Sequence, residues 1–168
     1  MEVAKEFVVF NKAWAHVAKW EGGHVNNQYD RGGETKYGIS QRQYPNIDIK
    51  NLTEQEAKNI AYKDYWSVLH CGLLASEDLA IEMFDFGFNS GTRRAALVLQ
   101  RALNLLGSII AIDGDLGPDT IAAANYFSYT YEKALLNAVR GYEFLFYKDI
   151  VIKNPSQKPF IRGWLARI

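Results

Sequence analysis

Several kinds of residue are scarce in this sequence of 168 residues, and each shortage narrows what the protein can be. A single cysteine, Cys71, excludes an internal disulfide, so the fold must be held by its core. Basic and acidic residues number 19 each, and a net charge of zero argues against nucleic acid as the main partner. The three histidines, His16, His24 and His70, lack the short paired spacing of a zinc site. We therefore expect no metal and no cofactor.

Long apolar runs and targeting signals are also missing. The longest apolar run, 102–112, is too short to span a bilayer and is interrupted by Asn104 and Gly107. The N-terminus lacks the basic region and the apolar stretch of a secretory signal. We expect a monomer that is made in the cytoplasm without a signal peptide. It would reach an external substrate only after release or export, for example through a holin.

What the chain does contain is enough apolar and aromatic material for a core. Hydrophobic residues make up 48% of it, with 10 Tyr, 9 Phe and 4 Trp. Apolar residues at helical spacing, capping boxes and a proline before an apolar run predict a mainly α protein. A glycine-rich segment, 24–38, predicts a small β-hairpin element. The expected helices cover residues 2–20, 40–45, 53–69, 76–88, 95–106, a segment that begins at Pro118, and 131–152.

The first predicted helix carries an apolar stripe that ends in a carboxylic acid. The stripe continues four residues beyond Val17 to Glu21, and Gly22-Gly23 then ends the helix. Burial beside apolar groups raises a carboxyl pKa, which is what a general acid for glycoside cleavage requires. A solvated glutamate at a fraying helix end is the alternative interpretation. The stripe consists of Val3, Phe7, Phe10, Trp14 and Val17.

Two further candidates follow in the glycine-rich segment. Asp30 lies nine residues after Glu21, and Thr35 lies fourteen after it. A second carboxylate can stabilise an oxocarbenium-like transition state or orient a water, and a threonine hydroxyl can hold that water. Alternatively, both side chains satisfy backbone groups of turns, as short polar residues often do.

The run EGGHVNNQYDRGGETKYGI, residues 21–39, contains the pattern E-G-G followed by D-x-G-G-x-T-x-x-G-I. It resembles the signature of glycoside hydrolase family 108. These are N-acetylmuramidases of the lysozyme-like superfamily, some of them labelled secretion activator proteins. The resemblance extends over nearly the whole chain. Further similar segments are Lys63–Trp66, Phe84-Asp85, Asn89–Gly91 and Leu99–Leu103.

The resemblance assigns the catalytic glutamate of the family to Glu21. The order Glu, Asp, Thr is also similar to phage-type lysozymes, in which the threonine comes one residue later. The sequence departs from the family at Phe86-Gly87-Phe88, where Thr-Ala-Val is commoner. We predict a lysozyme-like α+β fold whose cleft lies between the first helix, the hairpin and the turn at Asn89. The predicted substrate-binding residues are Tyr37, Gly38, Asn89 and Gln100.

The later part of the chain resembles the predicted peptidoglycan-binding region that accompanies this family. The likeness is carried by D-G-x-x-G-P-x-T, residues 113–120. We expect a catalytic region over 1–94 and a helical region over 95–168, packed together as one unit. The alternative for the second region is a helix–turn–helix that only completes the core.

The resemblance implies a peptidoglycan hydrolase, an N-acetylmuramidase that cleaves the β-1,4 bond between N-acetylmuramic acid and N-acetylglucosamine. Two alternatives stay open. A lytic transglycosylase would use the same acid, with the substrate's own hydroxyl attacking in place of water. A non-catalytic cell-wall-binding or lysis-associated protein would not need Glu21.

Overall fold

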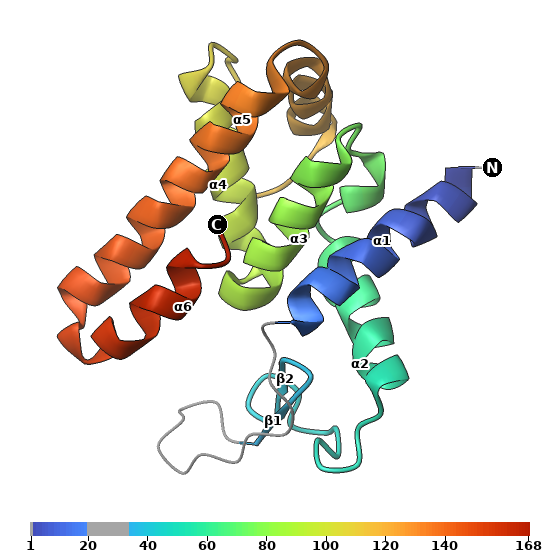
Figure 1. The fold of residues 1–168 in the computed structure, drawn as a ribbon. Coiled ribbons are helices and arrows are strands. Elements are labelled where there is room, and N and C mark those ends of the chain that lie inside the picture. The colour runs from blue at the N-terminus through green and yellow to red at the C-terminus, as the bar shows by residue number, and fades with distance from the viewer. Residues whose placement is uncertain (1, 20–33) are drawn as a thin grey trace.

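The computed structural model describes residues 2–19 and 34–168, with the side chains of residues 2 and 3 outside that description. It is mainly helical with one small antiparallel sheet, as predicted (Figure 1). The main elements are α1 Glu2–Ala18, β1 Thr35–Lys36, β2 Ile39–Ser40, α2 Glu54–Ala61, α3 Glu77–Ser90, α4 Thr92–Leu105, α5 Pro118–Lys153 and α6 Ile161–Leu165. Short π and 3-10 segments cover Tyr62–Trp66, Cys71–Leu73 and Pro155–Phe160. Within the described residues, no helix is both long enough and apolar enough to cross a membrane.

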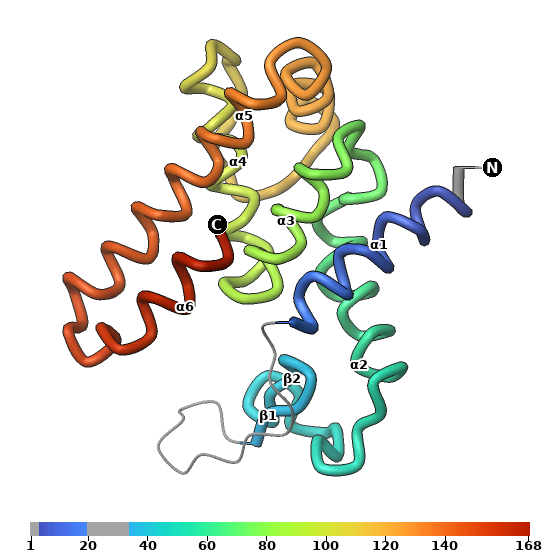
Figure 2. Tube along the Cα trace, in the orientation of Figure 1, coloured from blue at the N-terminus to red at the C-terminus, as the bar shows by residue number. Residues whose placement is uncertain are grey.

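Helix α3 occupies the centre of the fold. In Figure 2 it lies between α1 on one side and α4 with α5 on the other, and it contacts all three. Most of its side chains are buried, on every face of the helix. A helix that is enclosed all round is the core element of its domain, so the neighbouring helices are arranged around it.

The apolar stripe of α1 packs on this core through aromatic side chains. Phe10, Trp14 and Val17 are buried, as the spacing predicted. The Phe10 ring meets Phe84 of α3 edge to face, with centroids 5.6 Å apart. Phe7 lies at the margin, 46% exposed, and stacks on another ring of the same cluster. The stripe therefore fixes the rotation of α1 about its axis.

The predicted helix boundaries are confirmed at several caps. The Thr53 hydroxyl accepts from the Glu56 backbone N–H, and the Glu56 carboxylate accepts from the Thr53 N–H, which completes a capping box. The Ser76 hydroxyl caps α3, and Pro118 is the first residue of α5. The predicted helix start at Tyr131 corresponds to a kink inside α5, where Tyr131 has a φ of −145°.

The predicted short helix over 40–45 is wrong. The segment is a turn in which the Tyr44 N–H donates to the Ser40 carbonyl. The Gln41 amide donates to the carbonyls of Tyr44 and Pro45, so a side chain takes the place of helical backbone partners. Because Pro45 has no N–H to extend a helix, the turn ends there.

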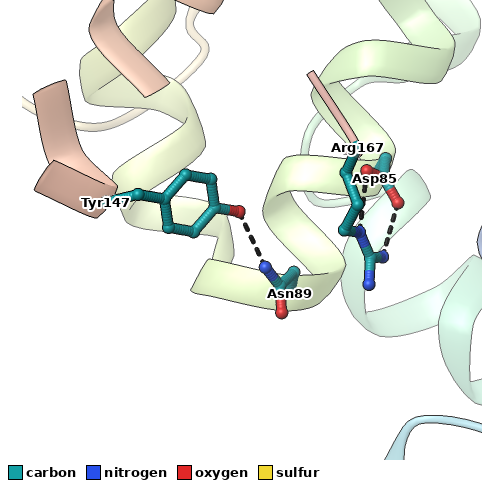
Figure 3. A network of polar contacts seen from close by, with 4 residues as sticks. All are labelled: Asp85, Asn89, Tyr147 and Arg167. Carbon is teal, nitrogen blue, oxygen red and sulfur yellow. Dashed lines mark hydrogen bonds and ion pairs between the residues drawn. The ribbon is translucent and has the colours of Figure 1, made fainter. Parts of the chain in front are cut away.

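A group of ionisable residues, here called the ionic cluster, joins α3 to α5 and to the C-terminus; its carboxylates are buried, and the Arg140 side chain is 42% exposed. The Arg140 guanidinium binds the Glu82 carboxylate at 2.7 Å and 2.8 Å. Arg167 binds Asp85 through two nitrogens, at 2.6 Å and 3.2 Å, and both side chains are 9% exposed (Figure 3). Glu143 of α5 completes the cluster and is 2% exposed. The Arg167–Asp85 pair is buried on both sides, and removing one partner of such a pair costs about 3–5 kcal/mol, because the other charge is left unpaired.

Glu143 keeps its proton in the folded protein. Burial, followed by the charges of Glu82 and Asp85, raises the pKa of Glu143 to about 10. Burial also raises the pKa of Glu82, but there the hydrogen bond and charge of Arg140 oppose the shift. A neutral Glu143 beside the Glu82 carboxylate avoids a pair of buried like charges, so this contact between α3 and α5 depends on one proton.

This proton makes stability depend on pH. In the unfolded chain Glu143 loses its proton above its ordinary pKa of 4.5, whereas the folded protein holds it to about pH 10. The contribution of Glu143 to the free energy of unfolding is thus complete below pH 4.5 and is lost progressively as pH rises to 10.

Glu143→Gln keeps a neutral donor beside Glu82 and does not titrate. We expect the melting temperature of the variant, relative to the wild type, to increase between pH 6 and pH 9. The exposed Glu132→Gln on the same helix is the control. A constant difference over that range would contradict the assignment.

Candidate functional site

Two of the predicted catalytic residues, Glu21 and Asp30, lie outside the described residues. The structure describes the elements on either side of them, the end of α1 and the hairpin β1–β2. Val17, one helical turn before Glu21, is 1% exposed. The described part of α1 therefore keeps its buried face up to the last turn before the predicted acid.

The hairpin is built around a tight two-residue turn at Tyr37-Gly38. Thr35 pairs with Ser40 and Lys36 with Ile39. Tyr37 has a φ of 53° and Gly38 a φ of 76°, which is the type I′ arrangement that matches the twist of the strands. Glycine adopts this backbone without cost, so Gly38 has a structural reason to be there.

Tyr37 occupies the same left-handed region with a large side chain, which is unusual for an aromatic residue. Its ring is half-buried and lies under the Lys36 ammonium, 5.6 Å from the nitrogen to the ring centroid. Lys36 also donates to the Lys50 carbonyl at 2.9 Å. The type I′ turn accounts for this positive φ, since both of its central residues require one. The sugar contact of Tyr37 stays a prediction.

Thr35 is half-buried on β1, at the start of the hairpin. The hairpin is fixed to the body of the protein by Ile39, which is fully buried, and by the turn that follows it. In that turn the Tyr44 hydroxyl donates to Asp64 at 2.9 Å. Thr35 thus sits on an anchored element, and its catalytic role stays a prediction.

Asn89 lies at the C-terminal end of α3 and is exposed. Its amide nitrogen donates to the Tyr147 hydroxyl at 2.7 Å, and in Figure 3 its oxygen points away from that hydroxyl. The Tyr147 ring stacks on Trp164, with centroids 5.3 Å apart. These side chains line a hollow of about 270 Å³, which is called the Asn89 hollow below. An amide held in this way can present its oxygen to an N–H of a ligand.

The two phenylalanines that replace commoner residues before Asn89 point into different parts of the core. Phe88 packs edge to face on Tyr65, with centroids 4.9 Å apart. Phe86 packs on Phe146 and Tyr147 of α5. The structure therefore supports the end of α3 with aromatic rings from both directions.

Gln100 is 1% exposed, and its amide is fully engaged with the loop before α5. The amide nitrogen donates to the Asp113 carboxylate and to the Asp115 carbonyl, both at 2.8 Å. Its oxygen accepts from the Gly114 N–H at 2.9 Å. Through these bonds Gln100, which lies on α4, holds the loop of residues 113–115, called the D-G-D loop below. They give no support to its predicted contact with substrate.

A second polar hollow, of about 270 Å³, lies between the last turn of α1 and the ionic cluster. It is lined by His16 of α1, Asp78 of α3 and the arginines of the cluster. Sequence reasoning considered His16 only as a metal ligand and did not connect it with the other residues, because no local motif joins segments so far apart in the chain. Among the described residues, no group of three His, Cys, Asp or Glu is placed to hold a metal ion.

Two family models match segments of this chain. The glycosyl hydrolase 108 family model matches residues 14–91, which include the whole 21–39 motif. This segment is therefore similar to glycosyl hydrolase family 108. The "Predicted Peptidoglycan domain" model matches residues 94–168. A search of curated proteins found no significant match to this chain.

Among solved structures, the chain is similar to SagA from Brucella abortus. The two are 26% identical, and the TM-score is 0.76 over 94% of this chain and 88% of that chain. The fold is therefore a mainly α, lysozyme-like fold. Together, the family 108 segment and the peptidoglycan segment indicate a glycoside hydrolase that acts on peptidoglycan.

Tyr37 can be tested with two replacements. Tyr37→Asn tolerates the left-handed backbone but removes the ring, whereas Tyr37→Phe removes only the hydroxyl. If the ring packs on a sugar, we expect the Asn variant to lose roughly tenfold in kcat/KM on peptidoglycan, about 1.4 kcal/mol. The Phe variant should retain most of its activity. An Asn variant with wild-type kcat/KM and an unchanged melting temperature would remove Tyr37 from the site.

For Gln100 we expect a substitution to lower stability and to leave activity unchanged. Gln100→Leu removes a buried amide that makes three hydrogen bonds to the D-G-D loop, and a typical hydrogen bond contributes about 1 kcal/mol to stability. We expect the melting temperature to fall by about 6–12 °C, since about 1 kcal/mol shifts it by about 2–4 °C in a protein of this size, with kcat/KM of the folded protein unchanged at 20 °C. An increase in KM with normal thermal stability would restore the substrate-binding role.

Proposed function

We propose that this protein is an N-acetylmuramidase with Glu21 as its general acid. It cleaves the β-1,4 bond between N-acetylmuramic acid and N-acetylglucosamine. The observation that carries the proposal is the family 108 match, which spans the motif that contains Glu21. The match to the peptidoglycan model over the rest of the chain supports the same polymer as substrate.

The proposed mechanism begins with proton donation by Glu21 to the glycosidic oxygen. Glu21 follows the apolar stripe in the sequence, and an acid beside apolar groups loses solvation when ionised, which favours the protonated form before the reaction. As the bond breaks, positive charge develops on the sugar ring. Asp30 stabilises that charge or orients a water, and Thr35 on the anchored hairpin holds the water. No cofactor takes part in these steps.

The surrounding elements have positioning roles in this proposal. Tyr37 at the hairpin turn offers a ring to a sugar face, and Asn89 offers its amide oxygen to an N–H of an N-acetyl group. The hydrogen bond from Asn89 to Tyr147 holds the amide in one orientation. Preorganised groups of this kind contribute because they need no reordering when substrate binds.

The test is the pair Glu21→Gln and Glu34→Gln, assayed on purified peptidoglycan. Both remove one carboxylate within the motif, but Glu34 occupies a position that the motif leaves variable. We expect Glu21→Gln to lower the rate about 100-fold or more and Glu34→Gln to change it little. Circular dichroism checks that both variants are folded. A Glu21→Gln variant that keeps its activity would exclude Glu21 as the acid and favour a binding protein or a different catalytic group.

Mass spectrometry of the digest identifies the bond and the product class. A muramidase releases fragments that end in reducing N-acetylmuramic acid. A lytic transglycosylase with the same acid would release the anhydro form, 18 mass units lighter because no water is added. Fragments ending in reducing N-acetylglucosamine would contradict the proposed bond specificity.

A further inference from the structure

A groove lined by residues of α4 and α5 has no role in the proposed reaction. It lies between α4 and the second half of α5, has a volume of about 490 Å³ and is called the α4–α5 groove here. Its walls are apolar: Val98 is buried, Phe146 and Ile150 are half-buried, and Leu145 is 43% exposed. All of its lining residues fall within the segment that matches the peptidoglycan model.

The rim of the groove is cationic although the protein as a whole is neutral. Arg94, Arg101 and Lys153 line it and are all exposed. The only acidic residue among the described lining is Asp149, which lies 3.8 Å from the Lys148 ammonium. The Arg94 guanidinium lies over the Phe146 ring at 5.7 Å, so one cation is held at the apolar wall. The groove thus combines small apolar surfaces with an excess of positive charge.

The groove adjoins the Asn89 hollow. Arg94, Phe146 and Ile150 line both, so the two form one continuous depression along α5. Asn89, which is a predicted substrate-binding residue, lines the end of this depression that belongs to the hollow. A ligand whose sugar part is held near Asn89 could therefore extend a side branch along α5.

We propose that the α4–α5 groove binds the stem peptide of peptidoglycan. This rests on the proposed function, since it assigns a second part of the same substrate to a second site. The stem peptide branches from the lactyl group of muramic acid, and it carries alanine methyl groups and free carboxylates. The methyl groups match the apolar walls, and the carboxylates match the cationic rim. A polyphosphate such as teichoic acid supplies the charge but not the methyl groups, so it fits the groove less well.

The effect expected of this site is retention on the polymer rather than tight binding. Exposed ion pairs contribute at most about 1 kcal/mol each and are weakened by salt. On a polymer that repeats the peptide at every muramic acid, several weak contacts still raise the residence time. Loss of the site should therefore weaken binding to intact peptidoglycan, with little effect on chemistry at the glycan.

The experiment uses the full chain with Arg101→Glu and Lys153→Glu, beside a control with Lys133→Glu and Arg162→Glu. The control makes the same charge change at exposed positions of the same segment outside the groove. Each pair is introduced into the Glu21→Gln protein, so that binding is measured without digestion. Cosedimentation is measured with intact, teichoic-acid-free peptidoglycan and with glycan strands from which an amidase has removed the peptides.

We expect the protein with an unaltered groove to bind intact peptidoglycan at least about tenfold more tightly than peptide-free glycan. The groove variant should lose this preference, and the control variant should keep it. Equal binding of the two polymers by the protein with an unaltered groove, or an unchanged preference in the groove variant, would overturn the proposal. So would a preference that appears only when teichoic acid is present, because the ligand would then be the polyphosphate.

The catalytically competent groove variant is assayed on soluble peptide-free glycan as well. We expect its rate there to equal that of the wild type, while its rate on intact peptidoglycan falls. A failure of the proposed function would appear instead in the Glu21→Gln assay or in the mass of the products. The two proposals can therefore fail independently.

Discussion

The enclosure of α3 on nearly every side is the constraint on which the rest of the structure depends. A buried helix must match a different neighbour on each face. Phe84 and Phe88 meet the aromatic rings of the α1 side, and Phe86 meets the rings of α5. The helix also carries Glu82 and Asp85, and burying their charges without partners would cost several kcal/mol each. Arg167 at the C-terminus is therefore part of the core, and Arg140 of α5, which is 42% exposed, pairs with Glu82 at the edge of the core.

This arrangement couples the family 108 segment to the peptidoglycan segment. The partners of Glu82 and Asp85 come from the second segment, and so does the Tyr147 hydroxyl that holds Asn89. The Asn89 hollow is consequently lined by residues from both segments. Any ligand that reaches this end of α3 meets a surface that neither segment forms alone.

The charge of the protein has to be considered locally. Its formal net charge is zero, which removes a general attraction to polyanions. Folding nevertheless gathers three cations at the rim of the α4–α5 groove. It also withdraws other charges into the ionic cluster, where they bind one another. A neutral composition is thus compatible with a surface that selects small anionic groups.

Much of the local structure could be predicted from the sequence, because its causes lie within a few residues. The capping box at Thr53 and Glu56, the proline that begins α5 and the buried stripe of α1 are of this kind. The 21–39 motif likewise predicted the family, since its fixed positions lie within one short segment. The short helix predicted over 40–45 was wrong because the Gln41 side chain bonds to backbone carbonyls in a way that spacing does not show.

Tertiary structure alone decided the roles of residues whose partners are distant in the chain. Arg140 lies 58 positions from Glu82, and Arg167 lies 82 positions from Asp85. No periodicity or motif connects such pairs, so the ionic cluster and the protonated Glu143 became visible only in the folded chain. The same holds for Gln100, whose burial against the D-G-D loop comes from packing between α4 and the segment before α5. Sequence determined which segments form helices and which motif carries the chemistry. Packing determined which charges are buried and which remain on the surface, because burial is a property of the assembled core.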